Sequence, residues 1–319
     1  MSPQEKRFLA RMERRAAGLS PELRTAILRA FAFLRDRLKP ADLERLIQSG
    51  DVEAAIRRTL TDEILQRAFQ PVRARIRQGT VDAAKANLRY VPAPPERLVG
   101  IAFDVLDPRV LTAIRTIESG AIGVLQGEVR ETFRAAITEG IRAGVHPRQV
   151  ARGLRDSIGL TPHQEGIIGN FRRALAEGDY AKALTYELRD KRFDPTLRRL
   201  LREERTLTAT QVQDLTAAYR RKFVARNAET LSRTAALEAQ RVGQQLAWKE
   251  ARASGALGGG EVVKVWVATL DDRVRPEHEI MHHAEAPLEG RYHNGDAYPG
   301  EGSPWNCRCT EVYRVRRAA

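Results

Sequence analysis

The chain has 319 residues, of which 42% are hydrophobic and only 6% are aromatic, and its formal net charge is +13. This length allows two or three domains, each with a core of its own. No run of about 18 apolar residues is present and the chain opens with a charged helical segment that includes Glu5, Lys6 and Arg7, so the sequence indicates neither a membrane-spanning helix nor a signal peptide.

Helical patterns fill the N-terminal part of the chain. We expect helices to begin at Ser2-Pro3 and again at Ser20-Pro21, because a hydroxyl cap there precedes a proline at the first helical position. Another helix follows from the cap Asp51 to about Phe69, where Pro71 should interrupt or kink it. These elements define an N-terminal helical region over residues 1–91.

The run Pro92-Ala-Pro94-Pro95 cannot continue a helix and predicts an extended linker, so we place a domain boundary there. A helix should then run from Pro108 to about Ala143, with a break at Gly120–Gly123. A turn with His146 precedes a short helix that ends near Asp156. Thr161 should cap the next helix, and further helices are expected over 180–188, 195–205 and 208–254, the last either continuous or divided near 227 or 243.

A glycine-rich run ends this long pattern, and the character of the chain then changes. Residues 262–268 are rich in β-branched and aromatic side chains, and residues 311–315 alternate, so both predict strands. Between them we expect turns and one short helix. The predicted fold is mainly α, an elongated multi-helix body with a small C-terminal α+β domain, divided into regions 1–91, 96–258 and 259–319.

Charge is distributed unevenly between these regions. Residues 259–319 contain ten Asp or Glu and eight Lys or Arg, a net of −2, so residues 1–258 carry +15. Such a basic helical region suits a nucleic acid or an acidic protein ring. An arginine-rich helix surface that is simply solvated fits the pattern equally well.

The cysteines and histidines gather near the C-terminus. Six of the eight lie between His278 and Cys309. The two cysteines, one residue apart, are too close for an unstrained disulfide, which is typical of a reducing compartment. Cys307 and Cys309 with His278 could hold a structural zinc ion, since thiolate and imidazole are zinc ligands; the alternative is that both cysteines are small buried residues in a turn.

The segment His278-Glu279-Ile280-Met281-His282 also matches the HExxH pattern of zinc proteases, with Glu279 as the general base. The surrounding sequence does not favour this reading. A helix that starts at Pro276 must end before Pro287, and its flanking residues are polar on all sides. A zinc-dependent hydrolase is therefore an alternative and not the expected function.

The C-terminal segment carries a spaced pattern of residues: Trp266, Asp271, Arg273, Arg275, His278, Asn306, Cys307, Arg308 and Cys309, with Gly290 and Pro299-Gly300 between them. This pattern resembles the Mu F-like phage head morphogenesis domain, found in minor head (minor capsid) proteins of tailed phages. Looser helical matches, such as Ser232-Arg233-Thr234, extend the resemblance over about residues 110–315. His282, His283 and His293 are departures from the family pattern.

The resemblance implies a low-copy structural protein of the virion that acts near the portal vertex in head assembly, DNA packaging or ejection. Its expected partners are the phage portal protein and other head proteins, with the packaged DNA as a further contact of the basic helices. We expect no enzymatic activity, no membrane partner and no cofactor beyond the structural zinc. We expect to find the chain in the virion and, during assembly, in the host cytoplasm. A nucleic-acid-binding helical protein without sequence preference is the other alternative.

Overall fold

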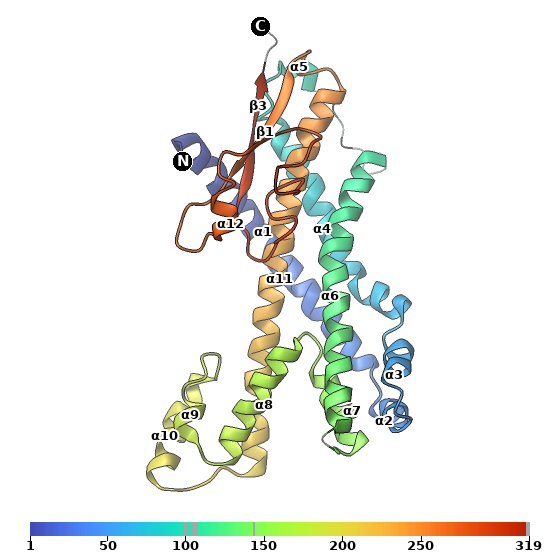
Figure 1. The fold of residues 1–319 in the computed structure, drawn as a ribbon, viewed down its shortest axis with the longest axis vertical. Helices are drawn as coiled ribbons and strands as arrows, with labels where there is room; N and C mark the ends of the chain where they lie inside the picture. The colour runs from blue at the N-terminus through green and yellow to red at the C-terminus, as the bar shows by residue number, and fades with distance from the viewer. Residues whose placement is uncertain (99–100, 102, 104–107, 143, 317–319) are drawn as a thin grey trace. The chain divides into compact units, whose positions relative to one another are not determined.

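The structure, a computed structural model, describes residues 1–98, 101, 103, 108–142 and 144–316. Helices make up most of these residues and a small three-stranded sheet lies near the C-terminus, which confirms the predicted mainly α fold with a small C-terminal α+β part (Figure 1). Among the described residues, no helix combines the length and apolar character needed to cross a membrane.

The chain forms two compact units, each built from separate stretches of sequence. The first comprises residues 1–27, 70–123 and 229–319, and the second residues 28–69 and 124–228. Four helices contribute residues to both units: α1 (Pro3–Arg37), α4 (Asp62–Leu88), α6 (Pro108–Arg142) and α11 (Ala209–Ala253).

The first unit contains the sheet, together with the short helices α5 (Pro95–Leu98) and α12 (Pro276–Glu279). Strand β1 (Glu261–Val267) is central, between the antiparallel strands β2 (Glu285–Pro287) and β3 (Thr310–Arg316). Because β1 has a neighbour on each side and packs within the unit, all its residues after Glu261 are buried. Figure 1 shows β1 and β3 along the C-terminal part of α11, where Trp248 stacks on Tyr313 of β3 at 4.9 Å.

Helices α11 and α4 approach closely in the first unit, and Gly243 makes this possible. A Cβ atom at Gly243 would lie 2.5 Å from the Thr80 carbonyl oxygen and 2.6 Å from Ala83 Cβ. Real Cβ atoms do not approach other atoms this closely, so only glycine fits between the helices without moving their backbones.

In the second unit, shorter helices pack with the segments of α1, α4, α6 and α11 that belong to it. They are α2 (Pro40–Gln48), α3 (Val52–Thr59), α7 (Pro147–Asp156), α8 (Pro162–Ala176), α9 (Tyr180–Ala183), the 3-10 helix η1 (Lys191–Phe193) and α10 (Asp194–Arg202). As predicted, Thr161 caps α8, and its side chain and that of Gln164 form a reciprocal capping box. Asn227 of α11 then donates a 2.8 Å hydrogen bond to the Gly159 carbonyl oxygen, which fixes the turn before α8.

The predicted breaks at proline and glycine were wrong in three helices. Helix α1 continues through Pro21, α4 through Pro71, and α6 through Gly120–Gly123. In α1 the Ser20 hydroxyl lies 3.1 Å from the Ser232 hydroxyl of α11, so it joins two helices instead of capping one. Large side chains next to these positions are buried, namely Leu23, Val72, Ile117 and Ile122. Burial of each contributes roughly 1.5–3 kcal/mol. This offsets the local helix cost of about 1 kcal/mol for glycine and about 3 kcal/mol for proline.

Two further helix bounds differ from the prediction. Asp51 caps its helix as expected, accepting a hydrogen bond from Ala54 N, but α3 ends at Thr59 and does not reach Phe69. The Thr61 hydroxyl accepts a hydrogen bond from Ile64 N and starts α4 as a separate helix. Helix α9 is likewise shorter than the predicted 180–188, and strand β2, which the sequence did not indicate, has only three residues.

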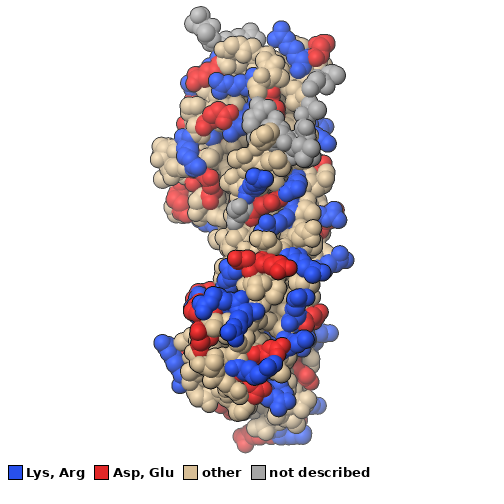
Figure 2. All heavy atoms as spheres, turned by 90° about the vertical axis from the view of Figure 1, so that its right-hand side faces the viewer, with Lys and Arg blue, Asp and Glu red and all other residues tan. Residues whose placement is uncertain are grey.

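Many arginines of the basic helices form ion pairs within their own unit. In the second unit, Arg134 contacts Glu53 at 2.6 Å and Arg220 contacts Glu165 at 2.8 Å. On the face drawn in Figure 2, basic side chains alternate with acidic ones and do not gather into one patch. These arginines are therefore neutralised locally by acidic side chains, while the net charge of +13 is unaffected.

Candidate functional site

Three buried side chains from distant parts of the terminal segment meet at one point. The His278 Nδ1 atom lies 3.4 Å from Cys307 Sγ and 3.7 Å from Cys309 Sγ. All three donor atoms lie within 4.8 Å of one another, and none of the three residues is more than 3% exposed. The structure thus brings together the residues that the sequence suggested as zinc ligands.

The imidazole is positioned by a single helical turn and an aromatic wall. His278 lies in α12, where its backbone N–H donates to the Arg275 carbonyl oxygen at 2.9 Å. The Trp266 ring of β1 meets the His278 ring edge-on at 5.6 Å, and Tyr292 packs on Trp266 at 5.2 Å. Apolar contacts continue with Met281, so the three donor atoms lie in a pocket with little access to water.

The cysteine-containing loop is held by one buried arginine of α11. Arg241, only 1% exposed, donates through Nε to the Cys309 carbonyl oxygen at 2.8 Å and through Nη2 to the Cys307 carbonyl oxygen. Two turns earlier in the same helix, the Thr234 hydroxyl accepts a hydrogen bond from Asn306 N at 3.2 Å. The long helix therefore fixes the backbone on both sides of the two sulfur atoms.

Close packing around Cys307 depends on a glycine. Gly300 has a φ of 87°, a conformation that side chains disfavour, and a Cβ atom there would lie 2.9 Å from Cys307 Sγ. The Cys307 N–H donates to the Pro304 carbonyl oxygen at 3.0 Å, closing the turn before the cysteines. Asn306 adopts a left-handed conformation, with a φ of 53°.

The two thiols differ in acidity. The pKa of Cys307 is held well below its usual range by a hydrogen bond from Cys309, with help from the positive charge of Arg241 and against the effect of burial. The pKa of Cys309 is raised by that same hydrogen bond and by burial.

The charged residues of the terminal pattern surround this buried group. Arg308, mostly buried, contacts Asp271 Oδ1 at 2.5 Å, and its hydrogen bond lowers the pKa of Asp271. Arg275 donates through Nη1 to the Ser303 carbonyl oxygen at 3.1 Å and through Nη2 to that of Trp305. Both arginines thus tie the loop after β1 to the chain around Cys307. Arg273 is exposed and lies at the periphery, 3.9 Å from Asp271.

The HExxH segment does not form the arrangement of a zinc protease. Helix α12 ends at Glu279, so His278 and His282 do not share a helix. His282 instead belongs to a second group with His283 and Glu5, in which His283 Nε2 lies 3.0 Å from Glu5 Oε1 and the two imidazole rings stack at 3.8 Å. Glu279 and His293 are exposed.

A second buried polar centre lies on β3. The Glu311 carboxylate accepts hydrogen bonds from Tyr313 at 2.6 Å, from Tyr292 at 3.0 Å and from Gln245 at 3.1 Å. Burial raises the pKa of Glu311, and burial lowers the pKa of the neighbouring Lys264, which donates to the Ala297 carbonyl oxygen at 2.5 Å. These hydrogen bonds satisfy the buried carboxylate and join the sheet to α11, as expected of a structural network.

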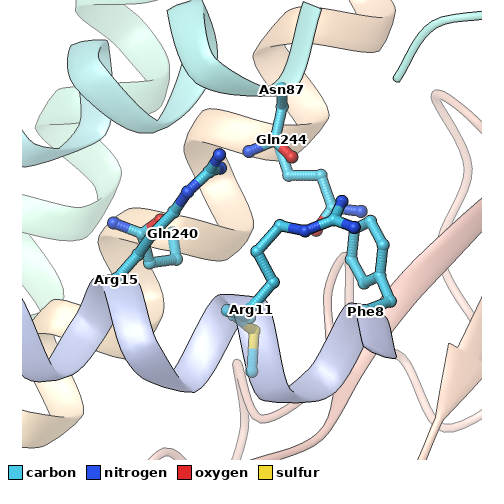
Figure 3. Close-up of a pocket in the computed structure, with 7 residues that line it drawn as sticks. Phe8, Arg11, Arg15, Asn87, Gln240 and Gln244 are labelled. Atoms are coloured by element: carbon cyan, nitrogen blue, oxygen red, sulfur yellow. The ribbon is translucent and has the colours of Figure 1, made fainter. Parts of the chain in front are cut away.

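Polar side chains also meet where α1, α4 and α11 pack in the first unit. Figure 3 shows Arg15 of α1 pointing toward Gln240 of α11 and Asn87 of α4, beside Gln244. Arg11 lies over the Tyr90 ring, 4.0 Å from its centroid. The cavity here measures about 10 Å³, room for one water molecule at most, so it is not a ligand pocket.

The sequence did not indicate Arg241, Glu238 or Glu5 as parts of these groups. Arg241 is one arginine among many in an arginine-rich helix, and nothing in its spacing distinguishes it. Glu238, three residues earlier, is also buried, and burial raises its pKa to about 7. The sequence signal that could have indicated these buried polar groups is a run of polar residues, from 238 to 245, at helix positions that should face the core.

Comparison of the chain with protein-family models, with curated proteins and with solved structures finds no match in any of the three. The functional argument therefore rests on the arrangement of the residues described above.

Proposed function

We propose that this chain is a minor head protein of a tailed phage, a low-copy component of the virion that acts near the portal vertex. The main support is spatial. Residues of the terminal pattern that are separated in sequence lie in one buried group, Trp266, His278, Cys307 and Cys309, and the Asp271–Arg308 ion pair borders it. If the resemblance were due to chance, the residues that make up the pattern would not be expected to lie together in the fold.

The attachment of the terminal segment to α11 agrees with a structural role. Arg241 and Gln244 of α11 bind main-chain carbonyl oxygens of Cys307, Cys309 and Glu311. Such contacts fix the terminal sheet to the helix and leave no substrate-sized opening at the three donor atoms, which are buried. We infer a rigid assembly element in place of a catalytic centre.

The charge distribution supports a partner with an acidic surface. Residues 1–258 carry +15 and residues 259–319 carry −2. Basic helices of this kind suit the packaged DNA or an acidic face of the portal ring, because both offer a dense negative potential. Head assembly would thus take place in the host cytoplasm, with the chain kept in the finished virion.

Genetics in cells that carry the encoding phage or prophage tests the proposal. An in-frame deletion should lower the yield of DNA-filled heads, and a wild-type copy supplied in trans should restore it. Arg241→Leu should complement poorly, whereas Arg273→Gln, which alters an exposed arginine of the same pattern, should complement fully. Heads that assemble and package DNA normally after the deletion would refute the proposal.

A further inference from the structure

We propose that His278, Cys307 and Cys309 bind one zinc ion through one nitrogen and two sulfur atoms. The inference rests on the geometry of the donor atoms and holds whether or not the chain is a head protein. It assigns the site a structural role, joining the one-turn helix α12 to the start of β3.

The distances from the imidazole nitrogen to the two sulfur atoms are those of a tetrahedral zinc site. With Zn–N of about 2.0–2.1 Å and Zn–S of about 2.3 Å, tetrahedral angles place nitrogen and sulfur about 3.6 Å apart. The observed separations from His278 Nδ1 are 3.4 Å to Cys307 Sγ and 3.7 Å to Cys309 Sγ. Both nitrogen–sulfur separations therefore suit a zinc ion that the three atoms share.

The donor types select the metal. Two thiolates and one imidazole favour zinc, whereas magnesium and calcium require oxygen ligands. Binding forms two Zn–S bonds, releases to solvent any proton that either sulfur atom carries, and transfers no electrons. No oxidant or reductant takes part.

Groups around the donor atoms are arranged to support metal-bound thiolates. Arg241 Nη1 is a buried N–H donor without a hydrogen-bond partner in the described part of the chain. The Trp266 side chain is within hydrogen-bonding reach of Cys309. Metal-bound sulfur commonly accepts such hydrogen bonds from surrounding groups. Arg241 also fixes the carbonyl oxygens of both cysteines, so the two sulfur atoms are held in place before the ion arrives.

A zinc ion would cross-link a part of the first unit that has little regular secondary structure. Within the described residues, the stretch after 259 forms only three strands and one short helix. The ion would link chain segments that are 29 residues apart, from His278 to Cys307. Loss of the ion should therefore loosen α12 and the Cys307 loop together.

Metal analysis of the purified full-length chain tests the proposal. We expect one zinc per chain, both thiols protected from a thiol-modifying reagent, and exposure of both thiols after chelation. Cobalt added to the chelated protein should give the strong visible bands of a tetrahedral ion and thiolate-to-cobalt charge-transfer absorption. Cys307→Ser and His278→Gln should each weaken zinc binding at least about 100-fold, since changes to groups that merely surround a metal already cost 10–100-fold.

The second group of histidines supplies the matched control. His282→Asn with His283→Asn removes two imidazoles close by and should leave the zinc content and the cobalt spectrum unchanged. Circular dichroism of each variant shows whether the helices persist, and cobalt spectra of those that fold report the ligands directly. Two results would overturn the assignment. One is less than one zinc per chain together with thiols that react equally before and after chelation. The other is a cobalt spectrum that is lost in the His282/His283 variant and kept in Cys307→Ser. Either result leaves the head-protein proposal standing, because that is judged by virion yield.

Discussion

Replacing Gly300 by alanine should perturb the buried cysteine loop by two separable effects. Gly300 has a φ of 87°, and an alanine in this conformation costs about 1–2 kcal/mol. The new Cβ atom would also lie 2.9 Å from Cys307 Sγ, so the sulfur must move by about 0.5 Å to restore ordinary contact, and such overpacking costs about 1–3 kcal/mol more. We expect Gly300→Ala to lower the free energy of unfolding by about 2–5 kcal/mol in total.

Gly295 allows the two effects to be separated. Its φ is 90°, but a Cβ atom there would meet nothing within 4 Å, so Gly295→Ala carries the backbone cost alone. Urea unfolding of both variants gives the two free energies, and thiol modification reports the displacement of Cys307. The reasoning is refuted if the two variants lose the same stability within about 0.5 kcal/mol and Cys307 stays equally protected in both.

Three further predictions concern the first unit and its charged groups. Gly243→Ala should destabilise the chain by about 1–3 kcal/mol in urea unfolding, because the new Cβ atom forces α11 and α4 apart. As the control, Gly127→Ala changes an open helical position and should stabilise the chain by up to about 1 kcal/mol. Equal effects of the two substitutions would contradict the close helix contact. Burial raises the pKa of Glu238 from 4.5 to about 7, so the contribution of this group to stability should be complete below pH 4.5, fall between pH 4.5 and 7, and level off above 7. Glu238→Gln should abolish this fall, which amounts to about 3 kcal/mol at pH 8; an unchanged pH profile of unfolding would disprove the assignment. Asp271→Asn and Arg308→Gln should each cost about 1–2 kcal/mol, and the double variant less than their sum, because both remove the same ion pair; strict additivity in a double-mutant cycle would argue against it.

Local signals in the sequence identified several elements correctly. Thr161 with Pro162 marks the start of α8, and Asp51 marks the start of α3, because a cap depends only on the residues of one helical turn. The strands β1 and β3 follow from β-branched residues and alternation. The uninterrupted helices through Pro21 and Pro71 could not be predicted in this way, since packing against distant residues outweighs the local cost.

The candidate site was predictable only in part. Residue types alone singled out His278, Cys307 and Cys309, because few other side chains bind zinc. Their support by Arg241 depends on contacts across 66 or more residues of sequence, which no spacing rule indicates. The same limit applies to the HExxH match: its five residues say nothing of where a helix of one turn ends, and it was the flanking residues that argued against a protease.

The central claim is that this chain is a component of phage heads, and quantitative mass spectrometry of purified particles tests it most directly. The phage that encodes the chain is purified to homogeneity, and peptides of this chain are counted against those of the portal and major capsid proteins. The account predicts that the chain is present in DNA-filled heads in few copies, comparable to the portal and far below the major capsid protein. Particles with a full complement of capsid and portal peptides and none from this chain would contradict it.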